Sequence, residues 1–112
     1  MFVKIYRYRV LPTQLDKCLA IQERAARLYQ MDADHQAIYL QSSSDPCQWM
    51  EIHRYRDEVS WQQSTERMGA SAEVAALRNE FSSTLDPAFP SQMEDYHQRS
   101  HFAGDGPGGP GQ

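Results

Sequence analysis

The sequence is poor in the features that mark several large classes of protein. It has only two cysteines in 112 residues, Cys18 and Cys47, and they form no CxxC pair. Cysteine this sparse predicts two reduced thiols in a cytoplasmic protein and not a disulfide framework. Residues 1–10 carry charges inside an apolar run and show no cleavage-site pattern, so no signal peptide is expected. No apolar run approaches the roughly 20 residues of a membrane span, so no membrane partner is expected either.

The sequence also lacks an excess of basic residues. Its 11 Lys and Arg stand against 15 Asp and Glu, which gives a formal net charge of −4. Proteins that bind nucleic acid usually carry a basic patch, so the charge gives no reason to expect a nucleic-acid partner. The hydrophobic share of 40% is ordinary for a folded protein. The length indicates a single domain, and a core this small would gain from association with a second copy.

Hydrophobic periodicity predicts the order of the elements. Alternating apolar residues predict strands over residues 2–10, 35–41, 47–56 and 92–99, the last of them at a sheet edge. Apolar residues at spacings of three and four predict helices over residues 14–30, 57–67 and 71–85. Asp57 and Ser71 are typical capping residues for the second and third helices. Residues 103–112 are rich in Gly and Pro and predict a disordered tail, which leaves residues 1–102 as the folded domain.

The order β-α-β-β-α-α-β is the split βαβ, or ferredoxin-like, pattern, an α+β fold with a four-stranded antiparallel sheet and helices on one face. We expect the helices to cover the face with the aliphatic side chains, namely Val3, Ile5, Ile38, Leu40, Met50 and Ile52. The other face would then expose Tyr6, Tyr8, Tyr39, Trp49, Glu51, His53 and Tyr55. That is too much aromatic surface to leave in water, so we expect an identical sheet to cover it in a symmetric homodimer.

One stretch, residues 47–61, combines architecture with chemistry. It reads CQWMEIHRYRDEVSW and predicts a strand that runs directly into a helix opened by Asp57. Because successive side chains of a strand alternate between faces, one face carries Trp49, Glu51, His53 and Tyr55. These aromatics, the carboxyl and the imidazole could line a pocket, or they could form the wall of a subunit interface.

This strand-to-helix join, the YRYRV segment near the N-terminus and the order of elements resemble the antibiotic biosynthesis monooxygenase-like domains of the dimeric α/β barrel superfamily. The resemblance covers most of the folded domain. Members commonly carry an acidic residue, an aromatic residue two positions on, a second acidic residue two further on, and a histidine late in the helix. Tyr55 and Asp57 match the aromatic and the second acidic position. His53 and Ser64 occupy the other two positions, and Glu51 lies one strand repeat before His53.

The resemblance implies a homodimer of ferredoxin-like subunits. Some similar domains oxygenate quinol-type aromatic molecules without metal or flavin, others degrade haem, and many have no known activity. For this chain the first possibility implies a monooxygenase that acts without a cofactor on an aromatic or quinol-type small molecule.

A cofactor-free oxygenase needs a general base, donors that hold a phenolate, and a dry aromatic cavity. His53 is the candidate base, with Glu51 or Tyr55 beside it, and Arg54 or Arg7 would bind an anionic oxygen. The candidate cavity walls are Trp49, Trp61, Tyr6 and Tyr8. The alternative is that these side chains hydrogen-bond and pack across a dimer interface. The protein would then be a non-catalytic homodimer that binds a small ligand or serves as an interaction module.

Neither a cofactor nor a metal ion is predicted. A haem site would need an axial histidine, and no motif supports any of the candidates, which are His35, His53, His97 and His101. The spacing of His97 and His101 would suit metal ligands on a helix, but this segment predicts strand and tail. No Cys or acidic residue completes an obvious set of ligands.

Overall fold

The computed structural model describes residues 1–102 and 104, so the predicted tail lies almost wholly outside the described residues. The strands are β1 (Phe2–Arg9), β2 (His35–Gln41), β3 (Gln48–Tyr55) and β4 (Gln92–His97). The helices are α1 (Leu15–Tyr29), α2 (Glu58–Gly69) and α3 (Ala72–Ser82), and a 3-10 turn, η1 (Pro12–Gln14), precedes α1.

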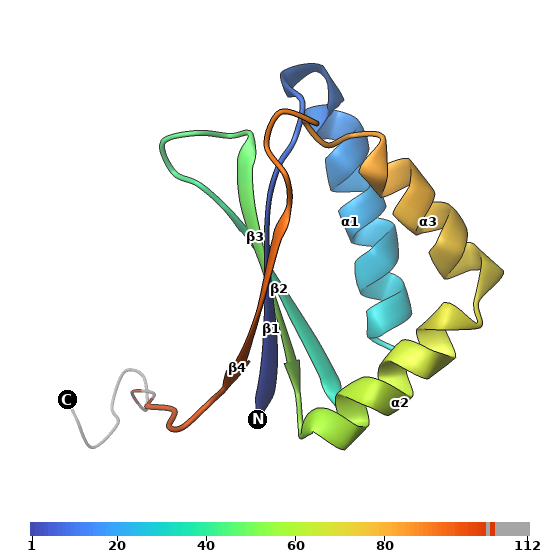
Figure 1. The fold of residues 1–112 in the computed structure, drawn as a ribbon, viewed down its shortest axis with the longest axis vertical. Coiled ribbons are helices and arrows are strands. Elements are labelled where there is room, and N and C mark those ends of the chain that lie inside the picture. The colour runs from blue at the N-terminus through green and yellow to red at the C-terminus, as the bar shows by residue number, and fades with distance from the viewer. Residues whose placement is uncertain (103, 105–112) are drawn as a thin grey trace.

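The strands form one antiparallel sheet in the order β2-β3-β1-β4. The last strand lies at a sheet edge, as predicted. All three helices lie on the same side of the sheet (Figure 1). The predicted α+β, ferredoxin-like architecture is therefore confirmed.

The two predicted helix caps are present. The Asp57 carboxylate accepts a hydrogen bond from the Ser60 N–H at 2.7 Å, and the Ser71 hydroxyl accepts one from the Val74 N–H at 3.3 Å. Each bond satisfies a backbone donor that the first helical turn leaves without a partner. The Asp57 cap starts α2 directly after β3, at the join on which the family resemblance rests.

The third helix ends at Ser82, three residues short of the limit that its apolar spacing predicts. Leu85, the last residue in that spacing, instead forms an antiparallel bridge with Val10. The Leu11 N–H donates to the Thr84 carbonyl at 2.8 Å, so the chain after α3 pairs with the chain after β1. Neither Val10 nor Thr84 has any exposed surface. This buried strand-like pairing replaces the helical hydrogen bonds and ends the helix.

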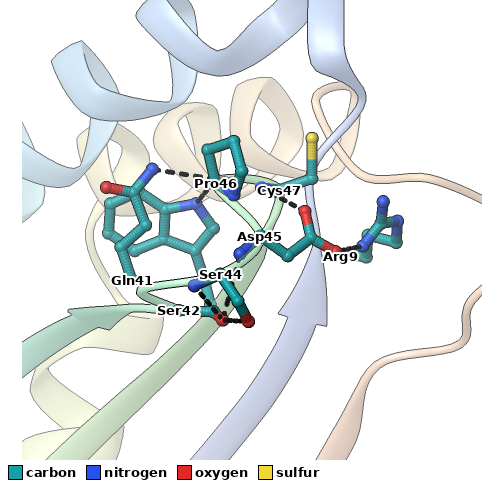
Figure 2. Close-up of polar contacts among 8 residues, drawn as sticks. Arg9, Gln41, Ser42, Ser44, Asp45, Pro46 and Cys47 are labelled. Atoms are coloured by element: carbon teal, nitrogen blue, oxygen red, sulfur yellow. Dashed lines mark hydrogen bonds and ion pairs between the residues drawn. The ribbon is translucent and has the colours of Figure 1, made fainter.

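The hairpin loop between β2 and β3 is held by its own side chains (Figure 2). The Ser42 hydroxyl accepts from the N–H groups of Ser44 and Asp45, both at 3.3 Å. The Asp45 carboxylate accepts from Arg9 and from the Cys47 N–H. These bonds tie the loop to the end of β1 and set the register of β3. A shift of one residue would reverse every side chain of β3, so the loop also decides which residues face the helices.

The helices cover the aromatic and polar face of the sheet, which is the opposite of the sequence-based expectation. Tyr8 and Trp49 are buried together with Val10 and Cys18, and Tyr6, Leu15 and Phe81 pack against this cluster. On the other face, Ile38 and Leu40 remain 41% and 44% exposed. The aliphatic face is therefore open, and the aromatic face forms the core.

This reversal has a physical explanation. Hydrophobicity alone favours burial of the aliphatic face, because the helices need an apolar surface to pack on. A tyrosine ring is also mainly apolar, however, and it can be buried once its hydroxyl has a polar partner. Gln22 of α1 provides one, since its Nε2 donates to the Tyr8 hydroxyl at 2.8 Å. The sequence pattern does not reveal this partner, because Gln22 comes from a distant element.

No helix of the described residues is both long enough and apolar enough to cross a membrane.

Candidate active site

A cavity of about 410 Å³ lies between the sheet and the three helices. Small-molecule pockets typically measure ~300–1,000 Å³. Its aromatic walls are formed by Tyr6, Tyr8, Tyr29, Tyr39, Tyr55, Trp61 and Phe81. Its polar lining consists of Lys4, Gln22, Glu51, His53, Ser64, Thr65 and Arg78. Aliphatic side chains such as Leu28, Leu77 and Met93 complete a wall that is mainly apolar and carries a set of polar groups, which is typical of a small-molecule site.

Strand β3 is one of the two central strands of the sheet and supplies the carboxylate and the imidazole of the cavity. Glu51 is paired with Tyr6 of β1 on one side and with Tyr39 of β2 on the other. His53 is paired with Lys4 and with Ala37 in the same way. The alternation of β3 directs Glu51 and His53 to the same face as these neighbours. A carboxylate is therefore placed between two tyrosines.

Glu51 and His53 are in direct contact. The Oε1 atom of Glu51 lies 2.8 Å from Nε2 of His53, and their side chains are only 13% and 5% exposed. Nδ1 of His53 lies 2.8 Å from Nε2 of His35 at the start of β2. Both nitrogens of the His53 ring are therefore already engaged, and the carboxylate of Glu51 is the acceptor at the cavity end of this chain.

Burial changes the acidity of the tyrosines around the cavity. Burial, with smaller contributions from the nearby Tyr29 and Glu51, raises the pKa of Tyr6 to about 12. Burial also raises the pKa of Tyr8, Tyr39 and Tyr55, because a phenolate loses more hydration than a phenol. These hydroxyls therefore keep their protons at neutral pH, and they are hydrogen-bond donors and not bases.

Two cationic side chains line the cavity. Lys4 is 4% exposed, and its ammonium group pairs with Asp95 of β4 at 2.7 Å. Arg78 of α3 is exposed at the cavity wall, and its charge favours the ionised forms of Tyr6, Tyr29 and Tyr55. Among the described residues Arg78 forms no ion pair. Its guanidinium is thus available to an anionic oxygen of a ligand.

The structure brings most of the predicted site residues together and separates three of them from the cavity. His53, Glu51, Tyr55, Trp61, Tyr6 and Tyr8 all line the cavity. Trp49 does not line it, because its ring is buried in the core with Cys18 and its indole N–H donates to the Pro46 carbonyl. Arg54 has the opposite parity to His53 on β3, so it lies on the open face, where it hydrogen-bonds to Gln36 and Gln98. Arg7 is also on that face and pairs with Glu94.

Several further residues line the site that sequence reasoning did not assign to it, among them Lys4, Gln22, Tyr29 and Arg78. Lys4 alternates with Phe2 and Tyr6 on β1, so its parity carried a signal. Gln22 interrupts the apolar stripe of the first helix, which was also a signal. Arg78 and Tyr29 showed no such sign, because their positions depend on how α1 and α3 pack on the sheet.

The histidines and carboxylates of the site do not form a metal centre. Nε2 of His35 and Nδ1 of His53 are 2.8 Å apart. Two nitrogens that share a tetrahedral zinc ion are about 3.3 Å apart, since each lies ~2.0–2.1 Å from the metal. Among the described residues no three His, Cys, Asp or Glu side chains are grouped as metal ligands. The ring nitrogens point at each other and not at a common centre.

Comparison of the sequence with protein-family models gives no match, and comparison with curated proteins gives none either. The structure, in contrast, is similar to several solved structures. A Nitrosomonas europaea protein named as a candidate antibiotic biosynthesis monooxygenase matches with a TM-score of 0.75 at 16% identity, over 89% of this chain and 100% of that one. A variant of SnoaB, a cofactor-independent oxygenase from Streptomyces nogalater, matches with a TM-score of 0.72 at 10% identity, over 89% of this chain and 94% of that one.

This chain has the antibiotic biosynthesis monooxygenase fold. Rv0793 from Mycobacterium tuberculosis shares it too, with a TM-score of 0.72 at 12% identity, over 91% of this chain and 98% of that one. The resemblance in the strand-to-helix join is therefore confirmed at the level of the fold. Identities this low establish the monooxygenase fold and leave the reaction to be argued from the site itself.

Proposed function

We propose that this protein is a cofactor-independent monooxygenase of a small hydroxylated aromatic molecule, with Glu51 as the general base. One observation carries the proposal: the carboxylate of Glu51 is held by His53 on the wall of an aromatic cavity. SnoaB, which has the same fold, is named a cofactor-independent oxygenase. The sequence favoured His53 as the base. We assign Glu51 instead, because both ring nitrogens of His53 are already in hydrogen bonds.

The reaction begins with a proton transfer. Glu51 takes the hydroxyl proton of the substrate, and the resulting phenolate lies between tyrosine hydroxyl donors and the positive charge of Arg78. O₂ is the oxidant, and it adds to a ring carbon that bears a hydrogen. The protonated Glu51 returns its proton to the peroxide oxygen, which regenerates the base.

The second half releases water. The O–O bond of the hydroperoxide breaks, one oxygen stays on the ring as a carbonyl, and the other leaves as hydroxide with the proton of the same ring carbon. The balance is hydroxyarene plus O₂ giving quinone plus water. The aromatic walls formed by Tyr6, Tyr55 and Trp61 hold the planar substrate and exclude bulk water.

Oxygen uptake with a panel of hydroquinones and naphthols tests the proposal. We expect the wild type to consume one O₂ per quinone formed, in the presence of a metal chelator as in its absence. Glu51→Gln should lower kcat by ~10²–10⁴-fold, since it removes a general base. Glu73→Gln, on the exposed start of α3, is the matched control and should keep the wild-type rate. A Glu51→Gln variant with the wild-type rate would refute the assignment of the base.

The same cavity supports a second function, the binding of a small aromatic molecule without turnover. Trp61 lines the cavity, so its fluorescence reports binding directly. Saturable quenching by a naphthol that is never oxidised would favour this function over the oxygenase.

We also propose a homodimer, formed through the open sheet face and not through the aromatic face. The open face exposes Ile38 and Leu40 beside the partly exposed Ile5, Met50 and Ile52. An exposed apolar patch of this kind on a sheet face is typical of an interface between subunits. Sedimentation should show a dimer at micromolar concentration, and a clean monomer would contradict the proposal.

A cytoplasmic location fits the two buried free thiols, Cys18 and Cys47, and is part of the same proposal.

A further inference from the structure

A third residue, His35, lies behind the Glu51–His53 pair and does not line the cavity. Its Nε2 atom is 2.8 Å from Nδ1 of His53, and Nε2 of His53 is 2.8 Å from Oε1 of Glu51. The three side chains thus form one hydrogen-bonded chain from the start of β2 to the cavity. Ala37 is paired with His53 on β2, and its small side chain leaves room for the two imidazoles to meet.

The His35 ring is fixed by the residues that enclose it. It stacks on Tyr55 with a centroid distance of 4.5 Å and an interplanar angle of 16°, and the Tyr29 ring of α1 lies 4.6 Å away. The residue is only 7% exposed. Its Nδ1 is the one buried side-chain nitrogen or oxygen of the described residues that has no hydrogen-bond partner.

Because Nδ1 of His35 has no hydrogen-bond partner, it determines which nitrogen of each imidazole carries a proton. Each of the two contacts holds one proton. If Glu51 is ionised, His53 carries its proton on Nε2 and His35 carries its proton on Nε2, so Nδ1 of His35 is a bare lone pair. The reverse order would place a proton on that Nδ1, where a buried donor has no acceptor. A buried donor without an acceptor is strongly disfavoured, so only the first order fits the structure.

The surroundings keep His35 neutral. Burial and, to a smaller extent, the neighbouring His53 lower its pKa to about 4, and Asp32 in the preceding loop opposes this shift. The other titratable groups that face the ring are Tyr29 of α1 and Tyr55 of β3, and both keep their protons because burial raises their pKa. At neutral pH the ring therefore donates through one nitrogen only.

We propose that His35 is a positioning residue for the base. Its Nε2–H holds the His53 ring so that the Nε2–H of His53 always points at Oε1 of Glu51. The carboxylate, which the Tyr8 hydroxyl also faces, is then fixed at the cavity wall, where it accepts the proton of the ligand. In both hydrogen bonds, His35–His53 and His53–Glu51, the donor proton points toward Glu51. A proton that Glu51 takes from the ligand therefore cannot pass through His53 to His35. It stays at the cavity, where the oxygenation step of the proposed function, on which this inference rests, needs it back.

Nitrogen-15 NMR of the histidine side chains tests the order of protons without any turnover. We expect the shared proton to be bonded to Nε2 of His35, with a through-hydrogen-bond coupling to Nδ1 of His53. His53 should carry its own proton on Nε2. A proton bonded to Nδ1 of either ring would overturn the proposal.

A second experiment tests the effect on the base, with para-nitrophenol as the probe because its phenolate absorbs visible light. His35→Phe keeps a ring between Tyr29 and Tyr55 but removes the donor. We expect this variant to ionise the bound probe about tenfold less than the wild type. His35→Gln supplies an amide donor in place of Nε2–H and should restore most of the ionisation. His101→Asn, at an exposed histidine, is the control and should behave like the wild type.

The variants separate the two proposals. If Glu51→Gln still ionises the bound probe, Glu51 is not the base and the proposed function fails. If Glu51→Gln abolishes ionisation while His35→Phe leaves it at the wild-type level, the base stands and the role of His35 is overturned. Loss of ionisation in His35→Phe together with its recovery in His35→Gln supports the positioning role, because a merely structural role would not depend on the donor.

Discussion

The ammonium nitrogen of Lys4 lies 4.2 Å from the centroid of the Trp61 ring. This contact joins β1 to α2, and both residues line the cavity. The same nitrogen pairs with Asp95, whose side chain is 55% exposed. A buried lysine is thus held by an aromatic face on one side and by a solvated carboxylate on the other.

Replacing Lys4 separates its packing from its charge. Lys4→Met keeps a long apolar stem against Trp61 and leaves Asp95 free to return to water, so we expect the free energy of unfolding to change by less than about 1 kcal/mol. Lys4→Ala opens a void beside the indole ring and should cost about 2–3 kcal/mol. Urea unfolding followed by tryptophan fluorescence measures both. Equal losses in the two variants would show that the charge, and not the stem, stabilises this contact.

The hydrogen bond from Gln22 gives the buried Tyr8 hydroxyl a polar partner under α1. Tyr8→Phe leaves the buried amide of Gln22 without its acceptor and should lower the free energy of unfolding by about 1–3 kcal/mol. Adding Gln22→Leu to Tyr8→Phe removes both polar groups and should recover most of that loss. A double-mutant cycle by chemical denaturation measures the coupling. Additive losses would contradict the role of this bond.

His35 predicts how stability depends on pH. Its pKa is lowered from an ordinary 6.5 to about 4 in the folded protein. Between these two values the unfolded chain binds more protons at this residue, so stability falls as the pH falls through this window and is unaffected by His35 above it. The full contribution is about 3 kcal/mol. Unfolding of His35→Phe should therefore depend less steeply on pH between 6.5 and 4 than unfolding of the wild type. Identical slopes would show that His35 is not buried in its neutral form.

The open sheet face predicts where a charge would separate two subunits. Ile38→Asp should raise the dissociation constant of the dimer by about 30-fold or more, because the interface would bury an unpaired carboxylate. Val59→Asp introduces the same charge on α2, at a residue that is 58% exposed, and should leave the dimer intact. Sedimentation equilibrium compares the two. Dissociation by both variants alike would point to general destabilisation and not to this face.

Local patterns in the sequence predicted the elements and their order. Alternation along residues 48–55 gave the strand on which Glu51, His53 and Tyr55 share a face, and Asp57 marked the start of the helix that follows. These features depend on neighbouring residues only. Most of the predicted site residues meet in one cavity for this reason, because they were chosen by their shared parity on β1 and β3. Trp49 shares that parity but lies at the end of β3, where the core is filled by Cys18.

The sequence by itself therefore determined the strands, the helices, their caps and the set of side chains that share each sheet face. Only the tertiary structure decided which face the helices cover, because the choice depends on partners from distant elements such as Gln22 beneath Tyr8. The tertiary structure also placed His35 of β2 against His53 of β3. Glu51 is therefore the cavity end of the hydrogen-bonded series His35–His53–Glu51. The face to which a side chain points follows from the alternation of one strand. Which face the helices bury, and which imidazole nitrogens carry protons, depends on contacts between different strands and helices.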